Sequence, residues 1–145
     1  MRTSRGAPCA WAPGLAGLMA CLIGSAAGAD DDQTIGEWRT AADLRVQVQA
    51  CGETVCARIV RLPDARTRDA NNPDARLRMR PVLGIQIFTG RRRIGSGGWT
   101  GQMYIPDSGT SYEARLTVPR HDTLEVAICG PIGLLCTRET WTRTR

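Results

Sequence analysis

The feature that most limits the fold of this chain is the alternation of apolar and polar residues with a period of two. Three segments show it, at 44–50, 112–118 and 123–129. Successive side chains of a β-strand point to opposite faces, so each segment has one apolar and one polar face. This pattern is typical of half-buried strands in an antiparallel sheet. The apolar faces hold Leu44, Val46, Val48 and Ala50, then Tyr112, Ala114, Leu116 and Val118, and finally Leu124, Val126 and Ile128.

Turn-forming sequences separate further strands. Segments 95–98 and 106–109 are rich in glycine, proline, serine and aspartate, which favour turns. About eight short strands at regular intervals predict a small antiparallel barrel or sandwich. The five additional strands are expected at about 36–40, 56–62, 82–88, 98–105 and 135–143.

One short helix is expected at about 72–79. Asn72 can cap its start, and Pro73 and Asp74 suit its first turn. Pro81 would end it. We expect this helix to cover one end of the sheet.

Residues 1–29 have the features of a secretory signal peptide. Two arginines precede an apolar run, and small residues before Ala29 suit signal peptidase. The run is roughly 17 residues long and is interrupted by proline and glycine, so it is poor as a membrane-spanning helix. A lipoprotein anchored through Cys21 is the minor alternative. We expect a periplasmic or secreted protein, cleaved near Ala29, with a single domain over 30–145.

The chain after residue 29 is only weakly basic. It holds 17 arginines, no lysine and 14 acidic residues, a net charge of +3. So small a charge, in a chain expected to be exported, argues against a nucleic-acid partner.

An even number of cysteines in an exported domain indicates disulfides. Four cysteines follow residue 29, and they allow three pairings. We favour Cys51 with Cys56 and Cys129 with Cys136, because each pair flanks a short turn and would face across a hairpin. The spacings are loose for a zinc site, so no metal is expected.

Short motifs extend along almost the whole chain after residue 29. They are Gly36-Glu37-Trp38, Cys51 and Cys56 before Ile59, Asp69-x-Asn71-Asn72-Pro73-Asp74, Arg78-x-Arg80-Pro81 with Gly84, Trp99-x-Gly101, Tyr104-x-Pro106-x-x-Gly109-x-x-Tyr112 and Trp141-x-Arg143. Together they resemble a family of small exported bacterial proteins classed as a domain of unknown function. The resemblance implies a lipocalin-like β-barrel. It implies no chemistry, because a fold does not fix a function.

Two positions depart from the family's pattern. Gln102-Met103 stands where a glycine followed by an aliphatic residue is usual, and Glu139 stands where glutamine is common. The first departure affects a strand bulge. The second places an acid where the pattern has an amide.

Lipocalin-like barrels place the tryptophan of a Gly-x-Trp motif beside an arginine from the last strand, and this pair closes one end. Trp38 and Arg143 are the corresponding residues here. A guanidinium stacked on an indole is attracted by roughly 1–2 kcal/mol when desolvated. We therefore expect Trp38 and Arg143 to serve the structure rather than to bind a ligand.

Strand parity brings further residues of the last strand inside. If Cys129 and Cys136 point outward, then Glu139, Trp141 and Arg143 point inward. Trp141 is assigned a structural role. Glu139 would then form an internal ion pair with Arg143 that serves the fold, or the polar floor of a ligand cavity. A bulge that reverses the register of this strand is the remaining alternative.

Four polar residues are candidates for the mouth of such a cavity. Asn72, Asp74, Arg78 and Arg80 would orient a ligand there. Capping of the short helix is the alternative explanation for Asn72 and Asp74.

Aromatic residues are the candidates for the cavity wall. Trp99, Tyr104 and Tyr112 combine apolar bodies with polar tips, although ordinary core packing also explains them. Trp99 and Tyr104 have opposite parity on one strand, so both face inward only if a bulge intervenes.

Little in the sequence favours catalysis. His121 is the only histidine and lies in a turn, and Gly95-Ser96-Gly97 lacks the pattern of a hydrolase nucleophile. An enzyme is disfavoured, and no cofactor is expected.

Three consecutive arginines, Arg91-Arg92-Arg93, are expected at a hairpin tip, where they are solvated or meet an anionic envelope surface.

These features favour an exported protein that binds a small, partly apolar ligand. Eight strands enclose packed side chains or one small molecule. The alternative is a cell-envelope protein-interaction module with a filled core, which would use Arg91, Arg92 and Arg93.

Overall fold

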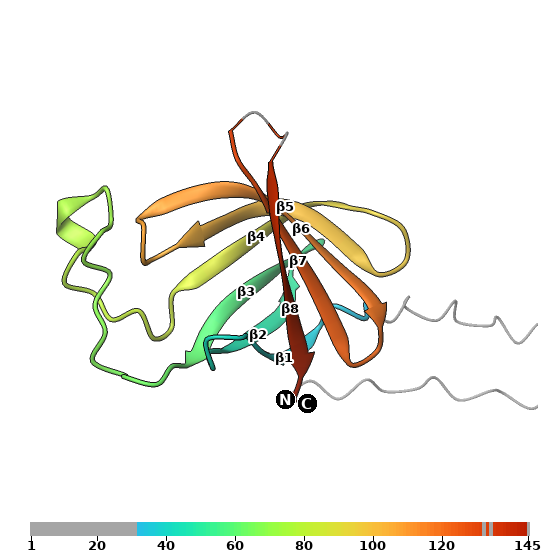
Figure 1. Cartoon of the computed structure of the whole chain (residues 1–145), viewed down its shortest axis with the longest axis horizontal. Helices are drawn as coiled ribbons and strands as arrows, with labels where there is room; N and C mark the ends of the chain where they lie inside the picture. Colours follow the sequence, from blue (N-terminus) through green and yellow to red (C-terminus); the bar gives the residue numbers. More distant parts are fainter. Residues whose placement is uncertain (1–31, 132, 134, 145) are drawn as a thin grey trace, which may run out of the picture.

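The computed structural model describes residues 32–131, 133 and 135–144. It is a closed antiparallel barrel of eight strands, in which each strand pairs with the next and β8 pairs with β1 (Figure 1). This confirms the eight-stranded all-β barrel. The predicted signal peptide, with Cys21, lies outside the described residues. The strands are β1 (Gly36–Arg39), β2 (Arg45–Cys51), β3 (Thr54–Arg61), β4 (Gln86–Arg93), β5 (Gly98–Ile105), β6 (Thr110–Arg120), β7 (Thr123–Cys129) and β8 (Cys136–Arg143).

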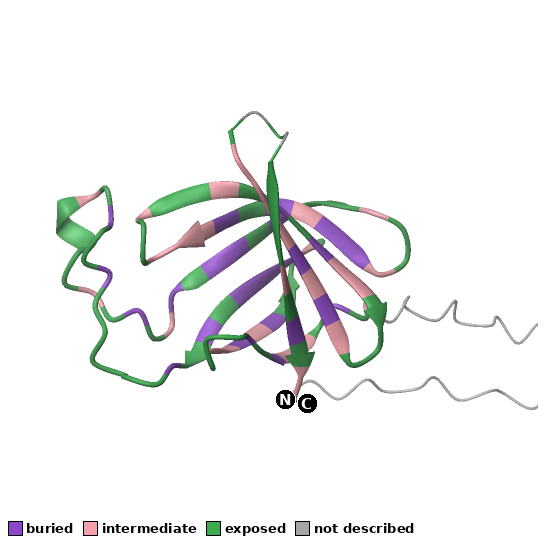
Figure 2. Cartoon of the chain, in the orientation of Figure 1, coloured by how far each residue is buried: buried purple, intermediate pink, exposed green. Residues whose placement is uncertain are grey.

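Alternation along the strands places apolar side chains inside the barrel, as predicted. Figure 2 shows buried and exposed residues succeeding one another along the strands. Val46 and Val48 of β2 are completely buried, as are Leu124 and Val126 of β7. These side chains meet in one core, and burial of an aliphatic side chain of this size stabilises the fold by about 1.5–3 kcal/mol.

The prediction for β4 was wrong: the strand begins four residues later and ends five residues later than expected. The strand was expected at 82–88 and runs over Gln86–Arg93. Residues 82–85 belong to the connection from β3, and Val82 and Ile85 are buried there, which produces an apolar pattern like that of a strand. In consequence Arg91–Arg93 form the end of β4 and not the hairpin tip, which is formed by residues 94–97.

The short helix expected at about 72–79 is present but shorter than predicted. The structure has a single 3-10 turn, η1 (Ala75–Leu77), capped by Asp74, whose carboxylate accepts the Arg76 N–H at 3.0 Å. None of the three residues of η1 is buried, so no packing supports a longer helix. Within the described part of the chain, no helix has the length and apolar character needed to cross a membrane.

A glycine fixes the approach of β4 to β5. A Cβ atom at Gly101 would lie 2.8 Å from the Phe88 ring and 2.9 Å from the Cα atom of Gly90. Such distances are shorter than van der Waals contact. The ring of Phe88, only 1 % exposed, occupies the space that a side chain at position 101 would need. This accounts for the glycine of the Trp99-x-Gly101 motif.

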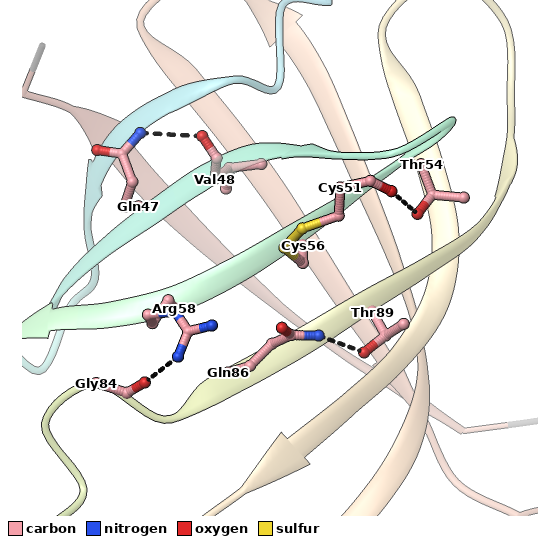
Figure 3. Close-up of a disulfide and its surroundings, with 9 residues drawn as sticks. All are labelled: Gln47, Val48, Cys51, Thr54, Cys56, Arg58, Gly84, Gln86 and Thr89. Carbon is pink, nitrogen blue, oxygen red and sulfur yellow. Dashed lines mark hydrogen bonds between the residues drawn. A yellow bond between two sulfur atoms is a disulfide. The ribbon is translucent and has the colours of Figure 1, made fainter.

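Both favoured disulfides are present. Cys129 and Cys136 lie directly opposite each other on β7 and β8. Cys51 and Cys56 bridge the β2–β3 hairpin (Figure 3), where the Thr54 hydroxyl also donates to the Cys51 carbonyl at 3.2 Å. The two bridges lie at opposite ends of the barrel, because each strand reverses the direction of the one before it.

One end of the barrel is closed by Trp38 and Arg143. The Arg143 guanidinium lies over the Trp38 ring, 4.1 Å from its centroid. The same guanidinium donates to the carbonyl oxygens of Gln33 (2.6 Å) and Ile35 (2.9 Å). Trp38 Nε1 donates to the Thr34 carbonyl at 2.9 Å. The segment before β1 is thereby held across the closed end.

These contacts lie at the weakest seam of the sheet. β1 and β8 share only two paired positions, Trp38 with Arg143 and Arg39 with Thr142. The backbone N–H of Thr144 donates to the Glu37 carbonyl at 2.8 Å and extends the seam by one bond. Side-chain contacts must therefore supply much of the force that keeps the barrel closed.

We expect Arg143→Ala to lower the free energy of unfolding by about 2 kcal/mol, because it removes the cation–π contact and charge-assisted hydrogen bonds. Urea unfolding followed by tryptophan fluorescence measures this. Arg138→Ala is the matched control: Arg138 lies on β8 and is exposed, and its ion pair among the described residues is with Glu125 at 3.3 Å, so the change should be within about 0.5 kcal/mol. Equal losses in both variants would contradict the assigned role of Arg143.

Candidate functional site

A pocket of about 460 Å³ opens at the end of the barrel opposite Trp38 and Arg143. Its rim is built by the β1–β2 hairpin, the connection 62–85 and the β5–β6 hairpin, and its wall by the inner faces of strands. In Figure 1 the connection is the long green-to-yellow segment beside the orange β5–β6 turn. The main apolar lining residues are Ile59, Leu62, Val82, Ile87, Met103 and Trp141.

The pocket exists because the two ends of the barrel are filled differently. Near the closed end, Leu116 is fully buried and its strand partner Trp99 is 5 % exposed, so large side chains occupy the interior. At the open end the lining is formed mainly by aliphatic residues, together with Met103, Tyr104 and Trp141. A volume of 460 Å³ lies within the range of roughly 300–1,000 Å³ typical of small-molecule sites.

A buried carboxylate anchors the connection that forms part of the rim. Asp69 is completely buried and accepts three hydrogen bonds from side chains: from the Tyr104 hydroxyl (2.6 Å), Asn72 Nδ2 (2.7 Å) and Arg80 Nε (2.8 Å). Its backbone N–H donates to the Arg80 carbonyl at 3.0 Å. We call Asp69, Asn72, Arg80 and Tyr104 the Asp69 cluster. It joins two parts of the connection, residues 69–72 and Arg80, to Tyr104 of β5.

The electrostatics of the Asp69 cluster favour a carboxylate and a neutral phenol. Burial raises the pKa of Asp69, but the hydrogen bonds from Tyr104, Asn72 and Arg80 outweigh burial and lower the pKa below its ordinary value of 3.8. Burial, together with the adjacent Asp69 carboxylate, raises the pKa of Tyr104 above 10.0. At neutral pH the hydroxyl therefore remains a donor and the carboxylate an acceptor.

A second contact docks the connection on the β5–β6 hairpin. Asn71 Nδ2 donates to the Asp107 carbonyl at 2.6 Å. Gly109 has a φ of 65°, and a Cβ atom there would collide with the backbone of Asn71. The glycine thus permits both the turn and the close approach. Because the connection and the hairpin both contribute to the rim, these contacts set the shape of the mouth.

The four predicted mouth residues divide between two places. Asn72 and Arg80 belong to the Asp69 cluster, beneath the rim. Arg78 donates to the Asn72 carbonyl at 2.9 Å, and Asp74 accepts hydrogen bonds from Arg76 on the exposed turn. None of the four side chains lines the pocket among the residues described. Asn72 also accepts the Asp74 N–H at 2.8 Å, so it does cap a turn.

The predicted aromatic residues are separated as well. Tyr104 lies at the pocket and also in the Asp69 cluster. Trp99 lies at the closed end, where Nε1 donates to Asp32 at 2.6 Å. Tyr112 is half-buried, paired with Met103, and outside the pocket lining.

The inward parity predicted for β8 brings Glu139 and Trp141 to the pocket wall. They pair with Val126 and Leu124, which point inward. The Glu139 carboxylate accepts the Ala41 N–H at 3.2 Å, while Arg143 donates to backbone carbonyls at the closed end. The suggested Glu139–Arg143 ion pair is therefore not formed. The indole N–H of Trp141 is buried without a hydrogen-bond partner among the described residues.

Sequence reasoning missed Asp69 as an organising residue. It stood within a motif, but its neighbours are polar and turn-forming, so nothing local indicated complete burial. It also missed Leu62 and Val82, which line the pocket from outside the strands.

In the described segments, no three histidine, cysteine or acidic side chains are placed to hold a metal ion.

Comparisons with known proteins agree with this architecture. The model of a family described as "Uncharacterized protein conserved in bacteria (DUF2147)" matches residues 36–143. The barrel is similar to that of protein HP1028 from Helicobacter pylori, which is described as belonging to the lipocalin family, with 20% identity and a TM-score of 0.69 over 77% of this chain and 82% of that one. This likeness confirms the lipocalin-like fold. No curated protein sequence matches significantly.

We expect Asp69→Asn to lower the free energy of unfolding by about 1–3 kcal/mol at pH 7, because the charged acceptor of three hydrogen bonds is lost. The lowered pKa of Asp69 means that its contribution is complete above the ordinary pKa of 3.8 and is lost as the pH falls through the folded-state pKa. The difference between wild type and variant should therefore shrink toward acid. Urea titrations between neutral and acidic pH measure it.

Glu53→Gln on the β2–β3 hairpin, at the other end of the barrel, is the control and should cost within about 0.5 kcal/mol. Trypsin supplies a second measurement, because the connection 62–85 holds exposed arginines such as Arg66 and Arg68. Cleavage there should accelerate in Asp69→Asn. An unchanged rate would contradict the anchoring role.

Proposed function

The chain belongs to the DUF2147 family of uncharacterised bacterial proteins, and on this premise we propose that it is an exported protein that binds one small, partly apolar molecule inside its barrel. The observation that carries the proposal is the pocket of about 460 Å³. A barrel of eight strands has room for one small ligand when side chains do not fill it.

The composition of the pocket supports an apolar ligand body. Aliphatic side chains and Trp141 form the wall, and polar side chains are concentrated toward the rim. Small-molecule sites commonly combine such a wall with a few polar groups that orient the ligand. A molecule that also presents a hydrogen-bond acceptor to Trp141 Nε1 would satisfy this buried donor, which otherwise costs about 1–3 kcal/mol.

The alternative was an interaction module with a filled core that uses an arginine-rich tip. A pocket of about 460 Å³ argues against the filled core that this alternative requires. The arginines themselves lie along β4, and Arg91 is already paired with Glu113 at 3.0 Å. The ligand-binding proposal is therefore preferred.

Export is the second part of the proposal. It is supported by the signal-peptide features of residues 1–29 and by two disulfides, which persist in oxidising compartments. We place the protein in the periplasm or outside the cell.

Expression of the full chain in a bacterial host should yield a protein whose first residue is Asp30, because the small residues at 27–29 suit signal peptidase. N-terminal sequencing of the periplasmic fraction measures this. Cys21→Ser should leave processing unchanged. A membrane-bound product that Cys21→Ser releases would instead identify a lipoprotein, and an unprocessed cytosolic protein would refute export.

The neutral fluorescent probe N-phenylnaphthylamine tests the pocket directly. It should bind the wild type at one site, and Ile128→Trp should weaken binding about tenfold or more, because the larger side chain fills the pocket and reduces the apolar area the probe can bury. Val60→Trp is the matched control: Val60 is 43 % exposed on β3 and does not line the pocket. Absence of binding to the wild type, or equal loss in both variants, would overturn the proposal.

A further inference from the structure

Among the described residues, the charged side chains that line the pocket all have the same sign. The chain carries 19 arginines, yet no arginine lies among the described residues that line the pocket. Three acidic residues do: Asp64, Asp107 and Glu139. Although the protein is weakly basic, the charged residues that line its pocket in the described part of the chain are all acidic.

These carboxylates differ in how far the protein neutralises them. Asp64 accepts the Arg66 backbone N–H at 2.9 Å and forms an ion pair with the Arg66 guanidinium at 3.4 Å. Across the described part of the chain, Glu139 and Asp107 form no ion pair. Glu139 is half-buried and accepts one hydrogen bond, from the Ala41 N–H. A carboxylate has about four acceptor positions, so Glu139 retains acceptor capacity.

The pocket offers few donors to an anionic group. The Thr67 hydroxyl donates to the Asp64 carbonyl at 2.7 Å, and the Tyr104 hydroxyl donates to Asp69 at 2.6 Å. Pro63 and Pro106, both at the rim, have no backbone N–H. The buried Trp141 N–H is a donor without a partner among the described residues, but it is a single neutral group beside three carboxylates. A carboxylate or phosphate entering the pocket would therefore meet more like charge than this donor can offset, which is unfavourable.

Glu139 is also placed at the transition from polar rim to apolar wall. Trp141 follows it on the same face of β8 and is 3 % exposed. Ile128 and Met103 belong to the same wall. A ligand with its apolar body against these side chains would bring one end toward the carboxylates.

We propose that the ligand is an amphiphilic cation: a molecule with an apolar body and an ammonium or amidinium group, whose positive charge is held by Glu139 and Asp107 at the mouth of the pocket. This inference rests on the proposed small-ligand function and specifies its chemical class. Glu139 accepts hydrogen bonds from the cationic group, and Asp107 adds negative potential at the rim.

The test compares three probes that share one hydrocarbon chain: octylamine, octanol and octanoate. Calorimetric titration of the processed protein, purified after expression of the full chain, at pH 7 and low salt, measures their affinities. We expect octylamine to bind about three- to tenfold more tightly than octanol, because one ion pair at a partly solvated site is worth roughly that factor. Octanoate should bind more weakly than octanol. Added salt should reduce the preference for the amine and leave octanol unaffected.

Variants locate the source of the preference. The double variant Glu139→Gln, Asp107→Asn should bind octylamine and octanol with similar affinity. The amide introduced at position 139 would still offer an oxygen to the Ala41 N–H, so the fold is retained, and unchanged octanol binding confirms this. The control removes two carboxylates outside the pocket, Glu53→Gln with Glu113→Gln, and should keep the preference.

The outcomes separate this inference from the broader proposal. A preference for octylamine that the double variant loses and the control keeps supports the inference. Equal binding of all three probes, stronger binding of octanoate, or a preference that survives in the double variant overturns it and leaves a small-ligand carrier in place. If the wild type binds none of the three probes, and N-phenylnaphthylamine also fails, both proposals fall.

Discussion

Closure of the sheet between β1 and β8 is the constraint on which the remaining structure depends. An open sheet would expose unpaired backbone groups at two edges and could enclose no interior. Here two paired positions and the stacking of Arg143 on Trp38 join the edges. The guanidinium does this without an acidic partner, because it is held by the π-face of an indole and by main-chain carbonyls. A planar cation with several fixed donors suits this arrangement better than an ammonium would.

Closure also explains why the interior has two different halves. At the end held by Trp38, Trp99 and Leu116 are also buried, and large side chains occupy the interior. At the other end the connection 62–85 forms part of the rim of the pocket and is anchored by the buried carboxylate of Asp69. The Asp69 cluster stabilises the rim, and of its four members only Tyr104 also lines the pocket among the described residues.

Much of the fold could be predicted from the sequence, because a period of two is a local signal and each inner face is buried. Both disulfides could be predicted, since hairpins bring their cysteines together. The candidate site was harder to predict from the sequence. Glu139 and Tyr104 were identified, but the sequence could not show that Trp99 serves the opposite end or that Asp69 is buried. Those facts depend on how segments distant in sequence meet. The apolar residues at 82–85 misled for the same reason: their burial comes from packing against the barrel, without strand pairing.

The arrangement of β1 and β8 has a practical consequence. The first strand begins and the last strand ends at the closed end, on the side away from the pocket (Figure 1). A fusion partner, a solid support or a surface-immobilised reporter attached beyond either strand would therefore leave the entrance unobstructed. For the ligand binding that we propose, a biosensor built on this barrel would have its attachment points and the pocket entrance at opposite poles.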